Sequence, residues 1–253
     1  MKNTLSFISL LRNEAIGAGL ILLVWSLSAM AYPAYIIPSP LEVLKAAAAG
    51  LPQGFGQHVL ITLYRVLAGF AFSLMAGTLL GSLAFVQKWG GQLNSLMMAL
   101  QVLPGTVLGV ILLLVCGLGS ATPILLIAFM VLPTLTINTF NGLYAKNLLL
   151  EEYLVTIKSK KRMLLSTIYL PALIPVLQSN ISLGVSLAVK VVVLGEFIGS
   201  QDGLGYLLNN ARIFLNMKEV FFYLLVLMIF TLIFQAVQHL FFSMFFRKYF
   251  YAG

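Results

Sequence analysis

The chain has 253 residues, of which 60% are hydrophobic and only 9% are charged, whereas an average soluble domain has about 25% charged residues. This composition excludes a water-soluble domain and predicts an integral membrane protein. A transmembrane barrel is excluded too, because its strands are about 10 residues long and alternate in polarity. The net charge of +8 would suggest nucleic-acid binding only if the basic residues gathered on a soluble face. Here they lie between hydrophobic stretches.

Five uncharged stretches follow one another along the chain, at residues 15–41, 66–87, 89–145, 163–189 and 220–246. A helix needs about 20 apolar residues to cross a bilayer, so the longest stretch has room for two crossings. The sequence therefore predicts an all-α integral membrane protein with six transmembrane helices. We expect one transmembrane domain over residues 1–253, with a first span at about 15–32 and core spans within about 59–244.

The Lys and Arg residues between the spans predict the orientation, because cytoplasmic loops carry the excess of these residues. With the N-terminus inside, the inner segments hold Lys2, Arg12, Lys88, Lys146, Lys158, Lys160, Lys161, Arg162, Arg247 and Lys248. The outer loops hold only Lys45, Arg212 and Lys218. Both termini are therefore predicted to be cytoplasmic.

Residues 1–31 also resemble a secretory signal, because a basic start precedes an apolar run that ends in Ala29-Met-Ala31. Cleavage there would leave five spans. We favour an uncleaved first span, since the charged region before it is long.

Glycine and proline within the spans predict close packing and a bend. Gly69, Gly77 and Gly81 share one side of the second span, so a neighbouring helix can approach closely. Pro104, followed by Gly105, is expected to bend the third span, because proline removes a backbone hydrogen bond and clashes with the preceding turn.

Residues 143–170 form the only long cytoplasmic segment, and their pattern is that of an amphipathic helix. One face carries Leu150, Leu154, Ile157, Leu164 and Ile168. The other parts carry Glu151, Glu152, Lys158, Lys160, Lys161 and Arg162. Such a segment can lie across a partner's surface, and a solvated basic loop that only fixes the topology is the alternative.

The sequence carries no motif for catalysis. The nucleotide-binding loop G-x-x-x-x-G-K-[ST] is absent. His58 and His239 have no metal-ligating residues at useful spacing, and Cys116, as the only cysteine, cannot form an internal disulfide. We therefore expect no catalytic residue, metal or cofactor in this chain, and we expect that it is not an enzyme.

Arg65 and Glu196 are charged residues within hydrophobic segments. Arg65 lies about seven residues, or ~10 Å, inside the second span, and Glu196 lies a few residues before the outer end of the fifth. An unpaired charge at such a position costs about 2.5 kcal/mol or more, so the sequence predicts an intramembrane ion pair between them. In the alternative, Arg65 extends outward to water and Glu196 meets backbone groups near Gly199.

Lys190 lies near mid-membrane on the fifth span, on the same helical face as Ser179, Ser182 and Ser186. Small polar residues in membrane helices most often mark helix packing. An ammonium group at this depth needs an acid or water, and Glu196 points about 120° away on the helix. The face is therefore predicted to line a translocation pathway that favours an anion; a contact of Lys190 with backbone carbonyls is the alternative.

The segment from Glu152 to Leu170-Pro171 resembles the cytoplasmic "EAA" loop of ABC importer permeases, in which a Glu begins the loop and a Leu-Pro closes it 18 to 19 residues later. Other segments resemble the nitrate, sulfonate and taurine branch of that family. They are Tyr35-Ile-Ile-Pro-Ser-Pro40, Thr62-Leu-Tyr-Arg65 with Gly69-Phe70, Asn138-Thr139 with Gly142, Gly195-Glu196, Gly203-Leu-Gly-Tyr206 and Ala211-Arg212 with Phe214. Together they cover nearly the whole chain.

The chain departs from this family at three loop positions, where Tyr153 and Leu154 replace two alanines and Lys158 replaces a glycine. A positive φ is easy for glycine but costs lysine roughly 1 kcal/mol. We therefore expect the break between the two short loop helices to be reshaped or absent. Gly105 and Val110 likewise stand where family members often have proline.

The resemblance implies a type I ABC importer permease fold and a role as the pore-forming subunit in a bacterial inner membrane. The implied partners are a second permease copy, two ATP-binding subunits that carry the ATP and Mg, and an extracytoplasmic substrate-binding protein. A heterodimer is left open, and no nucleic acid is expected. The loop 143–170 would couple to the ATPase through Glu152, Lys158, Ser159, Lys160, Lys161, Arg162 and Pro171.

The implied cargo is a small solute, and Lys190 favours an organic or inorganic anion such as a sulfonate or nitrate. The sequence does not identify it. An ATP-independent channel or ion-coupled carrier, and a membrane scaffold subunit, are the alternative functions. Either would be separated from an importer by copurification with an ATPase.

Overall fold

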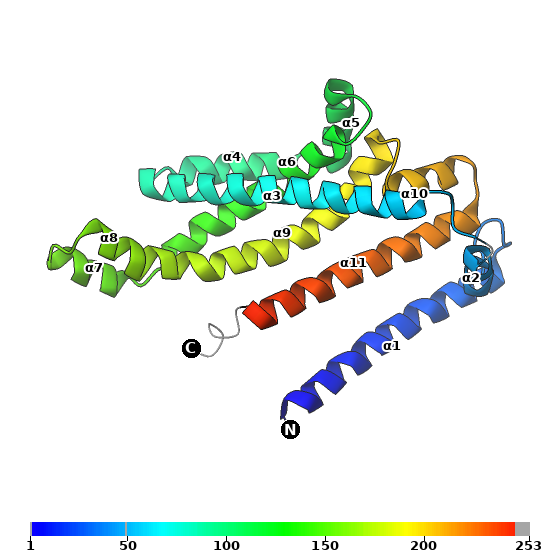
Figure 1. The fold of residues 1–253 in the computed structure, drawn as a ribbon, viewed down its shortest axis with the longest axis horizontal. Helices are drawn as coiled ribbons and strands as arrows, with labels where there is room; N and C mark the ends of the chain where they lie inside the picture. The colour runs from blue at the N-terminus through cyan, green and yellow to red at the C-terminus, as the bar shows by residue number, and fades with distance from the viewer. Residues whose placement is uncertain (1, 49, 246–253) are drawn as a thin grey trace. The chain divides into compact units, whose positions relative to one another are not determined.

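The computed structural model describes residues 2–48 and 50–245, and every regular element among them is helical (Figure 1). In chain order they are α1 (Lys2–Ala31), α2 (Pro40–Ala48), α3 (Phe55–Gln87), α4 (Gly90–Val102), α5 (Gly105–Cys116), α6 (Ala121–Tyr144), α7 (Leu148–Thr156), α8 (Lys161–Leu164), the π-helix η1 (Leu165–Tyr169), α9 (Leu170–Gly199), α10 (Leu204–Ile213) and α11 (Met217–Phe245). The all-α prediction is confirmed. Arg247 and Lys248, which the predicted orientation uses, lie outside the described residues, as do the side chains of Lys2, Arg12 and His239.

Four helical stretches are long and apolar enough to cross a membrane: Phe55–Gln87, Ala121–Tyr144, Lys161–Gly199 and Met217–Phe234. The pair α4 and α5 would make a fifth span if it crosses as one broken unit. Within α1, the described residues include an apolar stretch at Gly19–Ala31, and the predicted first span at about 15–32 stays a prediction. These helices identify an integral membrane protein, and the count of six spans stays a prediction.

The break between α4 and α5 is sharper than the expected bend, since the two helices meet at 87°. Leu103 and Pro104 both adopt extended backbone, with ψ of 123° and 128°. Proline pushes the residue before it out of the helical region and cannot donate a backbone hydrogen bond itself. Two residues therefore leave the helix at this point, and Gly105 begins a new one.

The chain divides into two compact units, and the first comprises residues 1–55 and 207–227. Within it, Trp25 donates a 2.9 Å hydrogen bond to the carbonyl of Pro38 and stacks on Phe221. Ser39 and Glu42 form a reciprocal capping box at the start of α2, at 3.3 and 3.1 Å.

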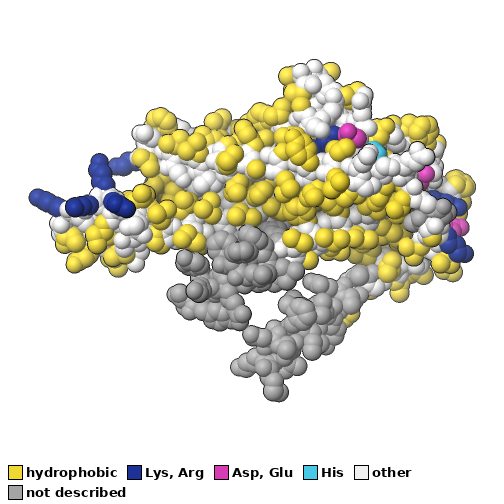
Figure 2. Space-filling model, viewed as in Figure 1, with side chains coloured by type: hydrophobic (Ala, Val, Ile, Leu, Met, Phe, Trp, Pro, Cys, Tyr) yellow, Lys and Arg dark blue, Asp and Glu magenta, His cyan; other side chains and the backbone are white. Residues whose placement is uncertain are grey.

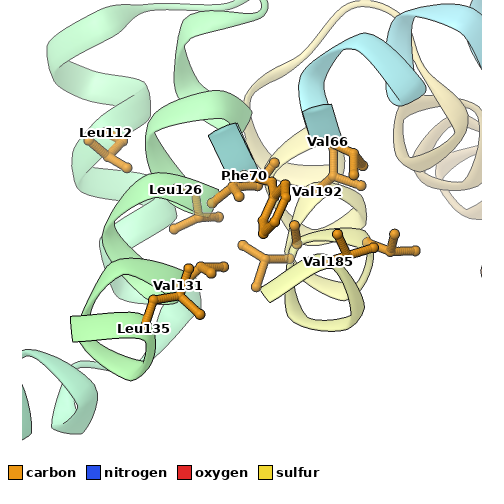
Figure 3. Packing of buried hydrophobic residues seen from close by; sticks show 12 residues of the cluster. Val66, Phe70, Leu112, Leu126, Val131, Leu135, Val185 and Val192 are labelled. Carbon is orange, nitrogen blue, oxygen red and sulfur yellow. The ribbon is translucent and has the colours of Figure 1, made fainter. Parts of the chain in front are cut away.

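The second unit comprises residues 56–206 and 228–253, and its core lies where α3 and α5 meet the neighbouring helices α6 and α9 (Figure 1). Figure 3 shows the buried cluster, which contains Val66, Phe70, Leu112, Leu126, Ile127, Val131, Leu135, Val185, Ala188, Val189, Val191 and Val192. Lipid tails are as apolar as these side chains, so close packing holds membrane helices together more than burial from water does.

The three glycines of α3 provide that close packing, as their spacing predicts. A Cβ atom built on Gly69 would lie 2.7 Å from the Cβ of Ile127, and one on Gly81 would lie 2.6 Å from the carbonyl oxygen of Thr136. Gly77 likewise faces Leu135 at 3.0 Å. The backbones of α3 and α6 therefore approach as closely as glycine allows.

Replacing Gly81 by alanine is expected to lower the free energy of unfolding by about 1–3 kcal/mol. The added methyl group meets the backbone of α6, which cannot rotate away as a flexible side chain would. Thermal unfolding of the purified chain in detergent measures the effect. Gly91→Ala is the matched control, because a Cβ atom there meets nothing within 4 Å. Equal melting temperatures for the two variants would contradict the packing argument.

Candidate functional site

The structure brings Arg65 of α3 and Glu196 of α9 together inside the second unit. Arg65 Nη1 lies 2.9 Å from Glu196 Oε1, and both side chains are fully buried. Both helices belong to stretches apolar enough to cross a membrane. The geometry is that of a desolvated ion pair and not of an arginine that extends outward to water.

The Glu196 carboxylate also accepts hydrogen bonds from Thr62 of α3 and from Gly205 of α10. The Thr62 hydroxyl lies 2.9 and 3.0 Å from its two oxygens, and the amide of Gly205 donates to Oε2 at 2.9 Å. The Thr62 oxygen in turn accepts from the amide of Leu204 at 2.9 Å. Buried charges need such additional partners, because desolvation otherwise exceeds the Coulombic gain.

Arg65 uses all five of its N–H groups. Nη1 also donates to the carbonyl oxygen of Asp202 at 2.9 Å, and Nη2 donates to the Asp202 carboxylate. Nε and Nη2 share the Ser120 hydroxyl, at 3.1 and 2.9 Å. One guanidinium therefore joins α3 to the turn before α6, to the end of α9 and to the loop before α10.

Gly203 allows this loop to close over the carboxylate. Its φ is +96°, and a Cβ atom there would lie 2.3 Å from the Glu196 carboxyl group, so only glycine fits. Its amide donates to His58 Nδ1 at 2.9 Å, and the His58 ring stacks on Tyr206. His58 is thus a packed imidazole that accepts a hydrogen bond. Among the described residues, no group of three or more His, Cys, Asp or Glu could hold a metal ion.

A second polar cluster lies between α6 and α9, and the sequence reasoning did not assign it. Asn180 is fully buried and donates to Thr139 Oγ1 at 2.8 Å, while Asn138 Nδ2 donates to Asn180 Oδ1 at 2.7 Å and to Ser179 Oγ at 3.2 Å. The available signal was an amide side chain within each apolar stretch. In a membrane such amides hydrogen-bond across helices.

The predicted pathway face therefore divides into two parts. Ser179 accepts a hydrogen bond from Asn138 of this cluster, which agrees with a role in helix packing. Ser182 and Lys190 are exposed on the single chain, and Ser186 is half-buried. Lys190 forms no ion pair with any residue that the structure describes.

The cytoplasmic segment folds as two short helices with a break between them. Asn147 caps α7 by accepting from the amide of Leu150 at 3.0 Å. After α7 the backbone of Lys158 turns to φ = +52°, with its amide bonded to Val155 O and the next amide, of Ser159, bonded to Leu154 O. This is the Schellman arrangement that ends helices.

The break is therefore present, and the expectation that Lys158 would abolish it is wrong. The lysine adopts the left-handed conformation that the family's glycine permits. Two backbone hydrogen bonds, both of 3.0 Å, hold it there against a cost of about 1 kcal/mol.

Lys158→Gly is expected to stabilise this turn by about 1 kcal/mol, because the strained φ costs glycine nothing. Amide hydrogen exchange at Ser159 should slow about five-fold. The matched control is Lys160→Gly. Lys160 has a φ of −61°, so its backbone is unstrained and glycine relieves no strain there. Faster exchange in Lys158→Gly than in the parent would contradict the strain argument.

Glu151 holds the segment against the ends of the longer helices. Tyr169 donates to Glu151 Oε1 at 2.5 Å, and Lys146 Nζ lies 3.2 Å from Oε2. The same ammonium group lies 4.3 Å from the centre of the Phe85 ring. These contacts tie α7 to the C-terminal ends of α3 and α6 and to η1.

The outward side of the segment is polar and charged. Glu152 is exposed and forms no ion pair within the described residues. Most of the predicted coupling residues are exposed as well: Lys158, Lys160, Lys161, Arg162 and Pro171. Ser159 is half-buried. Figure 2 shows Lys and Arg side chains gathered at α7 and α8, beyond the hydrophobic surface of the neighbouring helices.

The apolar side of the segment agrees only partly with the predicted face. Leu154 and Ile168 are each 4% exposed, and Leu150 and Leu164 are half-buried. Ile157, in contrast, is 52% exposed because α7 ends before it.

Residues 69–249 match a protein family described as "Binding-protein-dependent transport system inner membrane component". The chain is similar to the formylaminopyrimidine transport permease protein ThiX of Halalkalibacterium halodurans, with 28% identity over 74% of this chain and 76% of the relative. It is 29% identical to the putative aliphatic sulfonates transport permease protein SsuC of Bacillus subtilis, over 74% and 69%. Identity to the riboflavin transport system permease protein RibX of Chloroflexus aurantiacus is 29%, over 79% and 76%.

Proposed function

This chain belongs to the family of binding-protein-dependent transport system inner membrane components, and on that premise we propose that two copies of it form the pore of an ABC importer. It is a membrane permease subunit of such a transport system. In the proposed assembly, two separate ATPase subunits hold the ATP and Mg, and an extracytoplasmic protein delivers the solute. The first span is uncleaved, and both termini lie on the cytoplasmic side of a bacterial inner membrane.

The attachment of the cytoplasmic segment to the ends of the spans is the observation that supports this proposal most. Glu151 fixes α7 to the ends of the spans through Tyr169 and Lys146, while Glu152, Lys158, Lys160 and Arg162 are exposed. A helix held in this way transmits a push from a docked ATPase to α6 and α9 better than a flexible loop would. This supports coupling through Glu152, Lys158, Ser159, Lys160, Lys161, Arg162 and Pro171.

Reconstitution tests the proposed assembly. The tagged chain is expressed with candidate ATPase and binding-protein subunits from the same organism, purified, and placed in vesicles. We expect the ATPase to copurify and uptake to require ATP, the ATPase and the binding protein together. Solute equilibration without the ATPase would favour the channel or carrier alternative, and a stable complex without uptake would favour the scaffold.

The finer proposal is that the cargo is an anion. The names of the relatives include an aliphatic sulfonate, a formylaminopyrimidine and riboflavin, so family membership alone leaves the solute open. Lys190 is the residue that favours an anion, because it is exposed about one turn from Ser186 and two turns from Ser182 on a helix apolar enough to span the membrane.

Lys190→Met is expected to slow uptake of an anionic solute about five-fold or more, and Lys190→Glu to slow it further. Loss or reversal of one charge near a passing anion changes its energy by about 1 kcal/mol or more. Uptake is measured in vesicles that contain the ATPase and binding protein. Lys45→Met is the matched control, because Lys45 is exposed in α2. Uptake by both Lys190 variants at the parent rate would remove the residue-level support for an anion.

A further inference from the structure

A cleft of about 740 Å³ opens in the second unit where the ends of α3 and α6 meet α7, α8, η1 and the start of α9. This volume is within the range of small-molecule sites in proteins. Most of its wall is apolar, with Leu143 and Leu173 among the lining residues. Its polar groups include three lysines, Lys88, Lys146 and Lys161, but only one acid, Glu151.

Two positive charges remain in the cleft after the internal contacts are counted. Lys146 is neutralised by Glu151 at 3.2 Å, and its side chain is only 10% exposed. Lys88 and Lys161 are exposed and form no ion pair with any described residue. The site therefore combines an apolar wall with a net charge of +2, which suits an anionic amphiphile.

The backbone at Lys88 fixes the position of this lysine at the cleft. Its φ is +59°, and the amides of Lys88 and Trp89 bond to the carbonyls of Phe85 and Ala84 at 3.3 and 2.9 Å, which ends α3 in a Schellman turn. Glycine would serve that turn without strain, whereas lysine costs about 1 kcal/mol. The turn fixes Lys88 directly after α3, where its side chain lines the cleft.

The depth of the cleft points to a lipid as the source of the anion. Its walls are the last turns of α3 and α6 and the first turns of α9, all within stretches apolar enough to cross a membrane. Trp89, which follows Lys88, is 62% exposed, and tryptophan is enriched at the membrane interface. Basic pockets between helices at the cytoplasmic surface are suited to anionic headgroups.

We propose that this cleft binds one anionic phospholipid, with its phosphate between Lys88 and Lys161 and the start of an acyl chain along the apolar wall. Bound lipid would sit against Glu151 and Tyr169, the two residues that seat α7. It would thereby stiffen the segment that we propose docks the ATPase. Lipid binding itself requires neither the ATPase nor transport.

Native mass spectrometry of the purified full chain in an uncharged detergent tests the site. The probes are phosphatidylglycerol and phosphatidylcholine with identical acyl chains. We expect the parent chain to retain phosphatidylglycerol in preference, with a loss of about five-fold in this preference for each lysine replaced. The double variant Lys88→Gln/Lys161→Gln should therefore bind both lipids similarly.

Two further variants separate the cleft from general charge and from misfolding. Lys158→Gln/Lys160→Gln removes two lysines of the same segment that do not line the cleft, and it should keep the preference. Lys88→Arg/Lys161→Arg keeps both charges and should also keep it. An equal loss in the Lys158/Lys160 variant would overturn the proposal, because the attraction would then belong to the whole basic surface. Displacement of the lipid by millimolar glycerol 3-phosphate would overturn it as well, since the site would then take a free phosphate.

Discussion

Arg65→Met is expected to lower the free energy of unfolding by about 3–5 kcal/mol, the largest effect of any single substitution proposed for this chain. Methionine fills a similar volume, but it leaves the Glu196 carboxylate and its neighbour Asp202 without their cation. Glu196 is fully buried, so water cannot replace the lost hydrogen bonds. Thermal or denaturant unfolding in detergent measures the loss.

Two companion variants identify the cause. Glu196→Gln keeps the shape of the carboxylate and leaves Arg65 its contacts to Asp202 and Ser120, so a smaller loss of about 1–3 kcal/mol is expected. Arg162→Met removes an exposed arginine and should change stability by no more than about 0.5 kcal/mol. If Arg65→Met unfolds at the parent temperature, the buried network does not hold these helices together.

The partnership of Arg65 and Glu196 could be predicted because it depends on regular geometry. A helix rises 1.5 Å per residue, so the depth of each charge follows from its distance to the end of its span. Ser120 and Asp202 could not be predicted in the same way. They lie in turns, and the position of a turn depends on how the helices on either side pack.

In the loop helices, too, local sequence predicts the helices themselves but not the backbone conformation that a cap fixes. The periodicity of residues 143–170 predicts helices, and these are present as α7 and α8. The conformation of Lys158 was predicted wrongly, because intrinsic preference weighs about 1 kcal/mol and two capping hydrogen bonds together outweigh it. Local preference is therefore a weak guide where a cap fixes the backbone.

The two neighbouring acids Glu151 and Glu152 could not be told apart by sequence spacing. Adjacent residues on a helix point about 100° apart, so one can face the protein while the other faces solvent. Only the packing of Tyr169 and Lys146 shows that Glu151 is the inner one. The pair thereby provides a matched experiment, in which two identical side chains in one helix differ in their surroundings alone.

Glu152→Ala is expected to reduce ATP-driven uptake about ten-fold while ATP hydrolysis continues, provided that Glu152 contacts the proposed ATPase partner. A ten-fold loss corresponds to one contact of about 1.4 kcal/mol, which is ordinary for an important interface residue. The fold should be unaffected, because Glu152 is exposed and forms no ion pair with the described part of the chain. Uptake and hydrolysis are measured in the same vesicles, and unfolding is measured in detergent.

Glu151→Ala, in contrast to Glu152→Ala, should destabilise the fold around α7. It removes a buried-side hydrogen bond from Tyr169 and the partner of Lys146, so α7 should loosen, with faster amide exchange and a loss of about 1–3 kcal/mol in local stability. A transport defect in Glu152→Ala could not be explained by a lost interaction of the carboxylate with the helix dipole. Such an interaction is worth only about 0.3–1 kcal/mol and is confined to the first turn, which holds Glu151 and not Glu152. Full uptake by Glu152→Ala, with the ATPase still bound, would place the coupling contact elsewhere on the segment.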